Sequence, residues 1–549
     1  MNRALSSRQL EIISGVAIGI GLAIASQGFA FFSSMAGAIA GWAFFIWYGW
    51  IARKYQLLRR DWFLWGFIPA WAFMGFIFAR DDMTTTLYIG WTIWWLIVRG
   101  VWWVIKSSYF PDLRPQVRRG SVLLSTQRLS EIINQERPSA IQPQIEIGGV
   151  PIPNYYENLS FFFTGVPGSG KSTALKRIID TLRQREDWRG IILDRNGELM
   201  ESFYDPDKDV IFNPRDARSV RWNHRSERAR PETLSEAILP EPQGDDVFFV
   251  QGARAMLADL YKRADNNSQI WEIINTFSVA ELQEFLQGTP SEKYFTSEKT
   301  AGSILATLVN DARFYGDLAD IDPAGDGFSV YHWAKSSDPR WVWVPLFEDD
   351  SAIYRPLITG AFELALKGLL SDEGRSIRTG FFIDELGAIS QLKSLPRLLS
   401  EGRKFNGAGF LGAQTAAQIR KTYGEDSKRI ILQGCATKLI LRCGDPETSK
   451  EFAEVLGRQE VQEMMVGFNR SFLKSSSVSH NLQIRERYTV EPTELQHLPA
   501  LNGVLSVGGQ NPAPVALQPK SFENKQPRLV ERKAEATAAR GSSDEWWQE

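Results

Sequence analysis

Long apolar runs rich in tryptophan mark the first part of the chain. No charged residue occurs from 12 to 51, and a charge-free run of that length can hold two membrane-spanning helices of roughly 20 residues each. Two further aromatic runs occupy residues 62–79 and 87–105. Trp and Tyr crowd the ends of these runs, as they do at membrane interfaces. The pattern predicts an α-helical transmembrane bundle of about four helices in residues 1–106, in preference to a signal peptide or a buried core.

The basic residues give this predicted bundle an orientation. Arg3 and Arg8 precede the first predicted helix. Further basic residues lie between the second and third predicted helices and after the fourth. The other two connections hold only Arg80, beside Asp81 and Asp82. By the positive-inside rule, both termini face the cytoplasm. We therefore expect everything after residue 106 to be cytoplasmic.

The pattern changes after the apolar runs to one typical of a parallel α/β sheet. A buried strand at 159–164 enters a glycine-rich loop, followed by a helical stretch at 173–185 and a strand at 190–194. Short strands are also predicted at 121–125 and, around a Gly-Gly turn, at 145–152. Further predicted strands at 341–347, 380–384, 409–413 and 437–442 alternate with predicted helices at 355–370, 395–404 and 446–456.

A region without strand signals interrupts this alternation. Helical periodicity covers 247–263, 269–287 and 297–315. We predict a nucleotide-binding domain formed by residues 107–225 and 336–515, with an all-α insertion domain at 226–335. Residues 516–549 are polar, and we expect a disordered C-terminal tail there.

Charge and cysteine content narrow the class of protein. The net charge is −2, from 62 basic and 64 acidic side chains, which excludes a strongly basic nucleic-acid coat. Residues 1–119 carry 12 basic and 5 acidic side chains, whereas the rest carries 50 and 59. Any contact with DNA must therefore be local. The two cysteines, Cys435 and Cys443, exclude a disulfide framework and agree with a reducing compartment.

The glycine-rich loop has the chemistry of a phosphate site. Residues 165–172 read Gly-Val-Pro-Gly-Ser-Gly-Lys-Ser and fit the P-loop pattern G-x4-G-K-[ST]. Glycines let backbone N–H groups cradle phosphate oxygens, and the following helix adds its positive end. Lys171 is expected to reach the β- and γ-phosphates of ATP, and the Ser172 hydroxyl to ligate Mg²⁺. The predicted nucleotide-binding residues are Gly165, Gly168, Ser169, Gly170, Lys171, Ser172 and Thr173.

Two later strands end in residues suited to hydrolysis. The 380–384 strand ends in Asp384-Glu385, the Walker-B arrangement, in which Asp384 holds the metal shell and Glu385 orients or deprotonates water. Gln414, at the end of the next strand, is a candidate to sense the γ-phosphate or position water. The structural alternative for Asp384-Glu385 is a solvated acidic turn after an edge strand. For Gln414 it is a helix-capping or structural amide.

Phosphoryl transfer also needs positive charge in the transition state, often an arginine supplied in trans. Arg403 is the first candidate and Arg442 the second, each against the alternative of an ordinary surface charge.

The order of several motifs resembles that of the conjugative type IV coupling proteins, the TraD type in particular, within the FtsK/HerA-like group of P-loop motors. The resemblance covers roughly residues 120–510. It rests on the Gly-Gly hairpin at 145–153, the P-loop, Asp194-Arg195-Asn196-Gly197-Glu198, Asn213-Pro214 with Trp222-Asn223, the Asp384-Glu385 pair, and Glu401-Gly402-Arg403-Lys404-Phe405 leading to Gln414.

The resemblance implies an inner-membrane ATPase of bacterial donor cells that assembles as a homo-hexameric ring. Such proteins recruit a relaxase–DNA complex and pass it to the type IV secretion channel, and their all-α insertion is implicated in DNA contact. The resemblance carries over to Lys171, Asp384, Glu385, Arg403 and Gln414. Four predicted spans and a short tail depart from the family pattern, in which two spans are common.

Two other functions stay open. An FtsK-like segregation motor would need a long linker and a C-terminal DNA-reading domain, for which the chain after residue 510 is short and polar. A membrane receptor whose ATP binding controls assembly only would not need Glu385 or Gln414.

Overall fold

The computed structural model describes residues 116–532 except 139–140, 242–246, 324–326 and 470–476. The chain divides into two compact units, Met1–Leu113 and Arg114–Glu549, and the account below concerns the second. The four predicted transmembrane helices lie outside the described residues. Within the described ranges, no helix is both long enough and apolar enough to cross a membrane.

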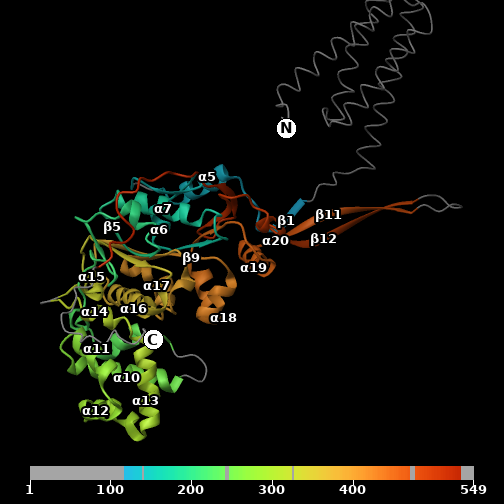
Figure 1. The fold of residues 1–549 in the computed structure, drawn as a ribbon. Coiled ribbons are helices and arrows are strands. Elements are labelled where there is room, and N and C mark those ends of the chain that lie inside the picture. Colours follow the sequence, from blue (N-terminus) through green and yellow to red (C-terminus); the bar gives the residue numbers. More distant parts are fainter. Residues whose placement is uncertain (1–115, 139–140, 242–246, 324–326, 470–476, 533–549) are drawn as a thin grey trace, which may run out of the picture. The chain divides into compact units, whose positions relative to one another are not determined.

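A nine-stranded sheet forms the centre of the second unit (Figure 1). Its order is β14-β13-β10-β4-β9-β8-β5-β7-β6, and the seven strands from β10 to β6 are parallel. The parallel strands are β4 (Phe161–Thr164), β5 (Trp188–Arg195), β6 (Asp209–Ile211), β7 (Trp341–Leu346), β8 (Arg378–Ile383), β9 (Gly407–Ala413) and β10 (Thr437–Ile440). Strands β13 (Asn502–Val507) and β14 (Ala513–Ala516) are antiparallel. All parallel strands therefore end at one edge, the carboxyl edge, and begin at the opposite amino edge.

Both faces of the sheet are covered by helices, as a parallel sheet requires. Successive residues of β4 join different cores: Phe162 belongs to one apolar cluster, whereas Phe161 and Phe163 belong to the other. One face carries α5 (Thr126–Glu136) and α7 (Lys171–Arg183). The other carries α16 (Ser351–Leu369), α17 (Leu395–Glu401), α18 (Ala416–Gly434) and α19 (Pro446–Leu456). The structure confirms the predicted α/β P-loop architecture.

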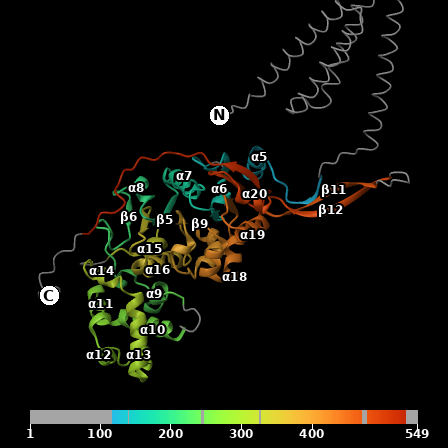
Figure 2. The same ribbon diagram turned by 45° about the vertical axis from the view of Figure 1, so that its right-hand side comes forward.

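In the described residues, the segment between β6 and β7 consists of helices joined by loops and contains no named strand. Its α-helices are α9 (Pro231–Ile238), α10 (Val247–Arg263), α11 (Asn267–Thr276), α12 (Val279–Phe285), α13 (Glu298–Asp311), α14 (Tyr315–Ala319) and α15 (Val330–Lys335). The predicted 269–287 helix is two helices, because Ser278 and Glu281 form a capping box that starts α12. Figure 2 shows α10 to α13 gathered below α15 and α16, away from the labelled strands of the sheet.

Two smaller sheets complete the unit. Strands β2 (Ile145–Ile147) and β3 (Val150–Ile152) pair around Gly148-Gly149, as predicted. Residues 121–125, predicted as a strand, are not one, because Ser125 caps α5 with its side chain. The strand lies just before them: β1 (Gln116–Gly120) pairs with β11 (Arg458–Asn469), which pairs with β12 (Ser477–Tyr488).

The residues after β14 differ from the predicted disordered tail. Leu517 is buried, and its N–H donates to the Leu501 carbonyl at 2.7 Å. Phe522 packs edge-on against Phe203 with ring centroids 4.9 Å apart, and Arg528 donates to Glu201 at 2.9 Å. A few apolar and charged side chains thus fix residues 517–532 on the domain, although their average composition is polar. Residues 533–549 lie outside the described part of the chain.

Candidate nucleotide site

The P-loop joins the end of β4 to the start of α7 at the carboxyl edge. Gly165, Gly168 and Gly170 have φ of +155°, +75° and +117°, conformations that glycine adopts without a Cβ penalty. Helix α7 begins at Lys171, and no side chain caps its first N–H groups. The buried Ser169 hydroxyl also has no hydrogen-bond partner. The loop therefore presents open donors at a helix N-terminus, the arrangement that binds phosphate.

Backbone contacts from distant segments hold the P-loop in place. The Val166 N–H donates to the Arg442 carbonyl at 3.0 Å, and the Ser169 carbonyl accepts from the Leu501 N–H at 2.8 Å. A Cβ on Gly170 would lie 2.9 Å from the Leu501 side chain. Sequence reasoning missed Leu501, since no motif marks it. The second arginine candidate, Arg442, thus supports the loop through its carbonyl group.

The acidic pair meets the P-loop directly. The Lys171 Nζ lies 3.3 Å from Glu385 Oε2 and 3.8 Å from Asp384 Oδ1, and the Ser172 hydroxyl donates to Asp384 Oδ2 at 3.1 Å. Glu385 is 3% exposed. Asp384 Oδ1 and Glu385 Oε1 are buried and accept no hydrogen bond. Two carboxylate oxygens without a hydrogen bond therefore point to bound groups that are not part of the chain.

These oxygens fit a magnesium–nucleotide complex. Mg²⁺ takes oxygen ligands, usually one or two carboxylates together with phosphates and water. Asp384 and Ser172 offer such oxygens, and Lys171 beside them offers charge for the β- and γ-phosphates. Glu385 keeps one free oxygen for a water molecule.

Gln414 lies at the same edge. It follows β9, which pairs with β8 on one side and β4 on the other. A Cβ on Gly412 would collide with the Asp384 carbonyl oxygen, so the two strand ends touch. The Gln414 N–H donates to Gln418 Oε1 at 3.2 Å, and its half-buried side chain is not used in that contact. Thr173, also half-buried, lies in the first turn of α7.

Arg403 does not join these residues. It lies in a 3-10 helix, η5 (Gly402–Phe405), just before β9 and hence at the amino edge. Its exposed guanidinium stacks 4.5 Å from the Tyr155 ring centroid and donates to the Tyr155 hydroxyl at 3.3 Å. Arg137 lies 4.3 Å from the same ring centroid. Within one chain, the full length of β9 separates Arg403 from Gln414.

A further buried acid supports the carboxyl edge beside Asp384. Asp194, near the end of β5, accepts N–H groups of Leu199 at 3.0 Å and Met200 at 2.6 Å. Burial raises the pKa of Asp194 to about 7, the two backbone donors oppose this rise, and the charge of Asp384 adds to it. Asp194 thereby shapes the loop after β5, in which Asn196 and Glu198 are both exposed.

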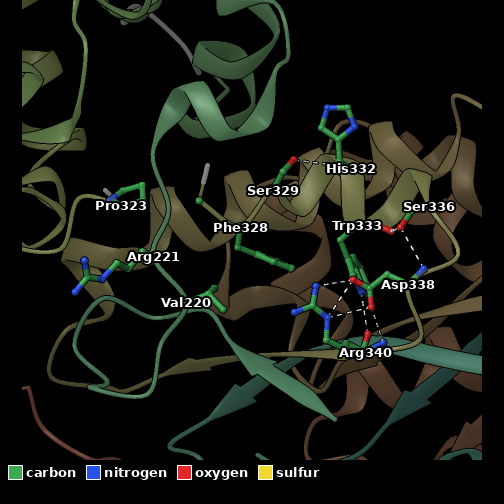
Figure 3. Close-up of a pocket in the computed structure, with 11 residues that line it drawn as sticks. Val220, Arg221, Pro323, Phe328, Ser329, His332, Trp333, Ser336, Asp338 and Arg340 are labelled. Atoms are coloured by element: carbon green, nitrogen blue, oxygen red, sulfur yellow. Dashed lines mark hydrogen bonds and ion pairs between the residues drawn. The ribbon is translucent and has the colours of Figure 1, made fainter. Parts of the chain in front are cut away.

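A cavity of about 620 Å³ lies elsewhere in the same unit (Figure 3). Val220, Phe328 and Trp333 form its apolar part, and Arg340 pairs with Asp338 at 2.6 Å on its wall. Arg340 directly precedes β7, so the cavity opens near the amino edge. No P-loop or acidic-pair residue lines it, and it plays no part in the nucleotide site.

Comparisons with known proteins agree with this geometry. Residues 144–518 match the family model described as the type IV secretion-system coupling protein DNA-binding domain. The bacterial conjugative coupling protein TrwBdeltaN70, in its unbound form, superimposes with a TM-score of 0.67 at 25% identity, over 76% of this chain and 97% of that one. TrwB in complex with ADP and Mg²⁺ gives 0.63 at 25% identity, over 77% and 98%.

Two curated relatives were found by sequence. The coupling protein TraD of Escherichia coli (strain K12) is 29% identical over 427 residues, 75% of this chain and 59% of TraD. The coupling protein VirD4 of Bartonella quintana (strain Toulouse) is 23% identical over 368 residues, 62% of this chain and 56% of VirD4. The match thus spans less than two thirds of either relative. The matched family model covers more than half of the chain. The protein therefore belongs to the type IV secretion-system coupling proteins, of the TraD type.

Proposed function

We propose that this protein is a membrane-anchored ATPase that couples a relaxase–DNA complex to a type IV secretion channel and drives DNA transfer by ATP hydrolysis. The observation that carries the proposal is the convergence of Lys171, Ser172, Asp384 and Glu385, with one oxygen on each acid that accepts no hydrogen bond. The relatives named for coupling and conjugation support the biological setting.

The nucleotide of this proposal is ATP with Mg²⁺. TrwB has been solved with a non-hydrolysable ATP analogue, with a TM-score of 0.66, and with ADP and Mg²⁺. In this chain, the P-loop N–H groups and Lys171 bind the phosphates, and Ser172 and Asp384 hold the metal. The metal neutralises charge that develops on the phosphates.

Hydrolysis needs Glu385 to orient the attacking water and accept its proton. Gln414 follows β9, which lies between the strands that lead to the P-loop and to the acidic pair. From there it positions the same water or senses the γ-phosphate. Arg403 lies at the amino edge of the sheet, opposite the nucleotide site of its own chain. Its charge therefore serves the nucleotide site of a neighbouring copy. This arrangement supports a homo-oligomer, for which a closed six-fold ring is the expected form.

The partners of the proposal are DNA, relaxosome proteins and secretion-channel proteins at the bacterial inner membrane. The matched family model is named for DNA binding. The apolar runs before residue 106 supply the proposed multi-pass anchor, with both termini in the cytoplasm. Because residues 120–549 are acidic overall, DNA contacts are confined to a few local basic groups and should weaken with salt.

The direct test is an ATPase assay on the full chain in detergent or nanodiscs, with single-stranded DNA, duplex DNA or no DNA. We expect Mg²⁺-dependent hydrolysis that DNA stimulates several-fold, and that falls as salt rises. Hydrolysis that no DNA stimulates would count against a DNA motor. ATP binding without any hydrolysis would favour a receptor whose nucleotide controls assembly only.

A further inference from the structure

A long two-stranded ribbon extends from the second unit. Strands β11 and β12 pair without interruption from Arg458↔Tyr488 to Asn469↔Ser477. Strand β1 covers only the first part of β11, from Gln116↔Gln462 to Gly120↔Gln459. Figures 1 and 2 both show β11 and β12 projecting beyond the helices around the sheet. In the described residues, no strand pairs with the outer edge of β12.

The ribbon is amphipathic. Directly paired residues share a face, so the register puts even-numbered positions of both strands on one side. From 462 to 468 and 478 to 484, six of the eight even positions are apolar: Met464, Val466, Phe468, Val478, Leu482 and Ile484. The odd positions from 463 to 469 and 477 to 483 contain one large apolar residue, Met465, among Glu, Gly, Asn, Ser and Gln. The ribbon thus has one apolar and one polar face.

Leu482 and Ile484, the apolar residues of this face whose side chains the structure describes, are open to solvent in the unit by itself. Leu482 is 55% and Ile484 is 53% exposed, the highest values among the large apolar side chains of the described residues. An isolated two-stranded ribbon cannot bury one of its own faces. Contiguous exposed apolar surface of this kind marks a surface that contacts a protein partner or a membrane.

The direction of β1 indicates what the apolar face meets. Strand β1 is antiparallel to β11, so its amino end, Gln116, points toward the turn of the ribbon. The chain therefore enters the sheet from the side toward which the ribbon projects. Beyond Gln462, β11 continues to Asn469, a length of roughly 23 Å at ~3.3 Å per residue.

The preceding sequence connects this entry point to the proposed anchor. The last apolar run ends at 105, and residues 106–115 can extend over at most ~36 Å. The free part of the ribbon, roughly 23 Å long, is thus comparable with the maximum length of this linker, ~36 Å. Lys106 and Arg114 lie in the linker, and Arg118 and Arg119 are exposed on β1, so the same region carries positive charge toward anionic lipid headgroups.

We propose that the apolar face of the β11–β12 ribbon lies on the surface of the lipid bilayer and steadies the motor against the membrane. This inference rests on the membrane anchor of the proposed function. The apolar positions enter the interfacial layer, the polar face stays in water, and the basic residues of β1 bind anionic headgroups. A second copy of the chain and residues 1–115 are the competing occupants.

The test compares two adjacent positions on opposite faces. Leu482→Cys and Asn481→Cys, each labelled with a small fluorophore in the full chain, are placed in nanodiscs that contain anionic lipid and a spin-labelled quencher lipid. The native Cys435 and Cys443 are buried, at 0% and 2% exposure, and do not compete for the label. Asn481 is exposed and serves as the matched control.

We expect several-fold stronger quenching at position 482 than at 481. Equal quenching at both positions, or none at either, would overturn the proposal. A label at 482 that escapes the quencher and crosslinks to a second copy or to residues 1–115 would assign the face to that occupant instead. If the chain fails to enter nanodiscs at all, the anchor itself is wrong, which separates that failure from failure of the ribbon contact.

A double variant gives a second readout. Leu482→Asp with Ile484→Asp should leave ATPase activity in detergent and retention in the membrane fraction unchanged, because neither residue belongs to the nucleotide site or the anchor. Fluorescence from a label at Val478→Cys, on the apolar face, should then shift toward that of a fully hydrated probe. Unchanged fluorescence in this variant would also contradict the proposal.

Discussion

At the carboxyl edge of the nine-stranded sheet, the Lys171 ammonium lies within 3.8 Å of both Asp384 and Glu385, and the three side chains are largely buried. At the amino edge, Arg403 is exposed and rests on a tyrosine ring. The buried group has its partners within one chain and is organised before any ligand binds. The exposed arginine has no phosphate site within reach of its own chain. The difference shows that the groups suited to bind phosphate and metal meet within one copy, whereas Arg403 lies away from them, as the proposed role on a neighbouring copy requires.

Replacing the exposed arginine should separate binding from hydrolysis most strongly. Arg403→Ala is expected to lower kcat by about 10³-fold, the low end for an arginine supplied in trans. The affinity of an isolated subunit for ATP should stay the same, because Arg403 lies at the other edge. An ATPase assay measures kcat, and a nucleotide titration measures the affinity for ATP. Lys404 is an exposed neighbour of Arg403, so Lys404→Ala is the control. A loss of ATP affinity in the monomer would contradict the in-trans role.

Removing the base should have a somewhat smaller effect on the same step. Glu385→Gln keeps the shape of a side chain that is 3% exposed and removes its capacity to accept a proton. We expect kcat to fall about 10²–10³-fold with ATP binding retained. Single-turnover kinetics with bound ATP would show this directly. Full turnover in the variant would assign Glu385 a structural role only.

Truncating the P-loop lysine should act on binding. Lys171→Ala removes the positive partner of both acids, and we expect ATP affinity to fall about 10²-fold, since losing one member of a buried charge pair costs a few kcal/mol. Lys176→Ala, on the same helix, is the matched control. Equal effects of the two substitutions would point to helix stability and not to phosphate contact.

Loosening the contact that holds Arg403 should have the smallest effect. Tyr155→Ala removes an exposed cation–π contact worth about 0.5–1 kcal/mol, so kcat should change only about two- to five-fold. Tyr155→Phe keeps the ring, loses the hydroxyl that accepts from Arg403, and should lie nearer the unaltered protein. No change in either variant would show that Tyr155 does not position the arginine.

Local sequence patterns were enough to predict the P-loop and the acidic pair Asp384-Glu385. The glycines and Lys171 stand within eight residues, and an apolar strand ending in Asp384-Glu385 implies that both acids reach the carboxyl edge. The same reasoning places Arg403 before strand β9 and Gln414 after it, so their separation follows from strand direction. The whole of α19, Pro446–Leu456, also matched its periodicity.

The remaining features depend on contacts between segments far apart in the chain, and no local sequence pattern predicts them. Leu501 braces the P-loop from more than 300 residues away, through a backbone hydrogen bond that any residue could make. Residues 517–532 look polar on average, yet Leu517, Phe522 and Arg528 fix them to the domain. The apolar face of the β11–β12 ribbon emerges only once the register is known, because alternation alone does not say which strand pairs with which.

The most direct test of the two-copy site mixes two inactive proteins. Glu385→Gln retains Arg403, and Arg403→Ala retains Glu385, so a mixed assembly contains some interfaces with both groups. With random assembly at equal amounts, about one quarter of the sites regain a full set, and hydrolysis should recover toward that fraction. If mixed assemblies form, as shown by capture of one tagged variant with the other, and hydrolysis stays at the level of either variant alone, Arg403 does not act on a neighbour's nucleotide.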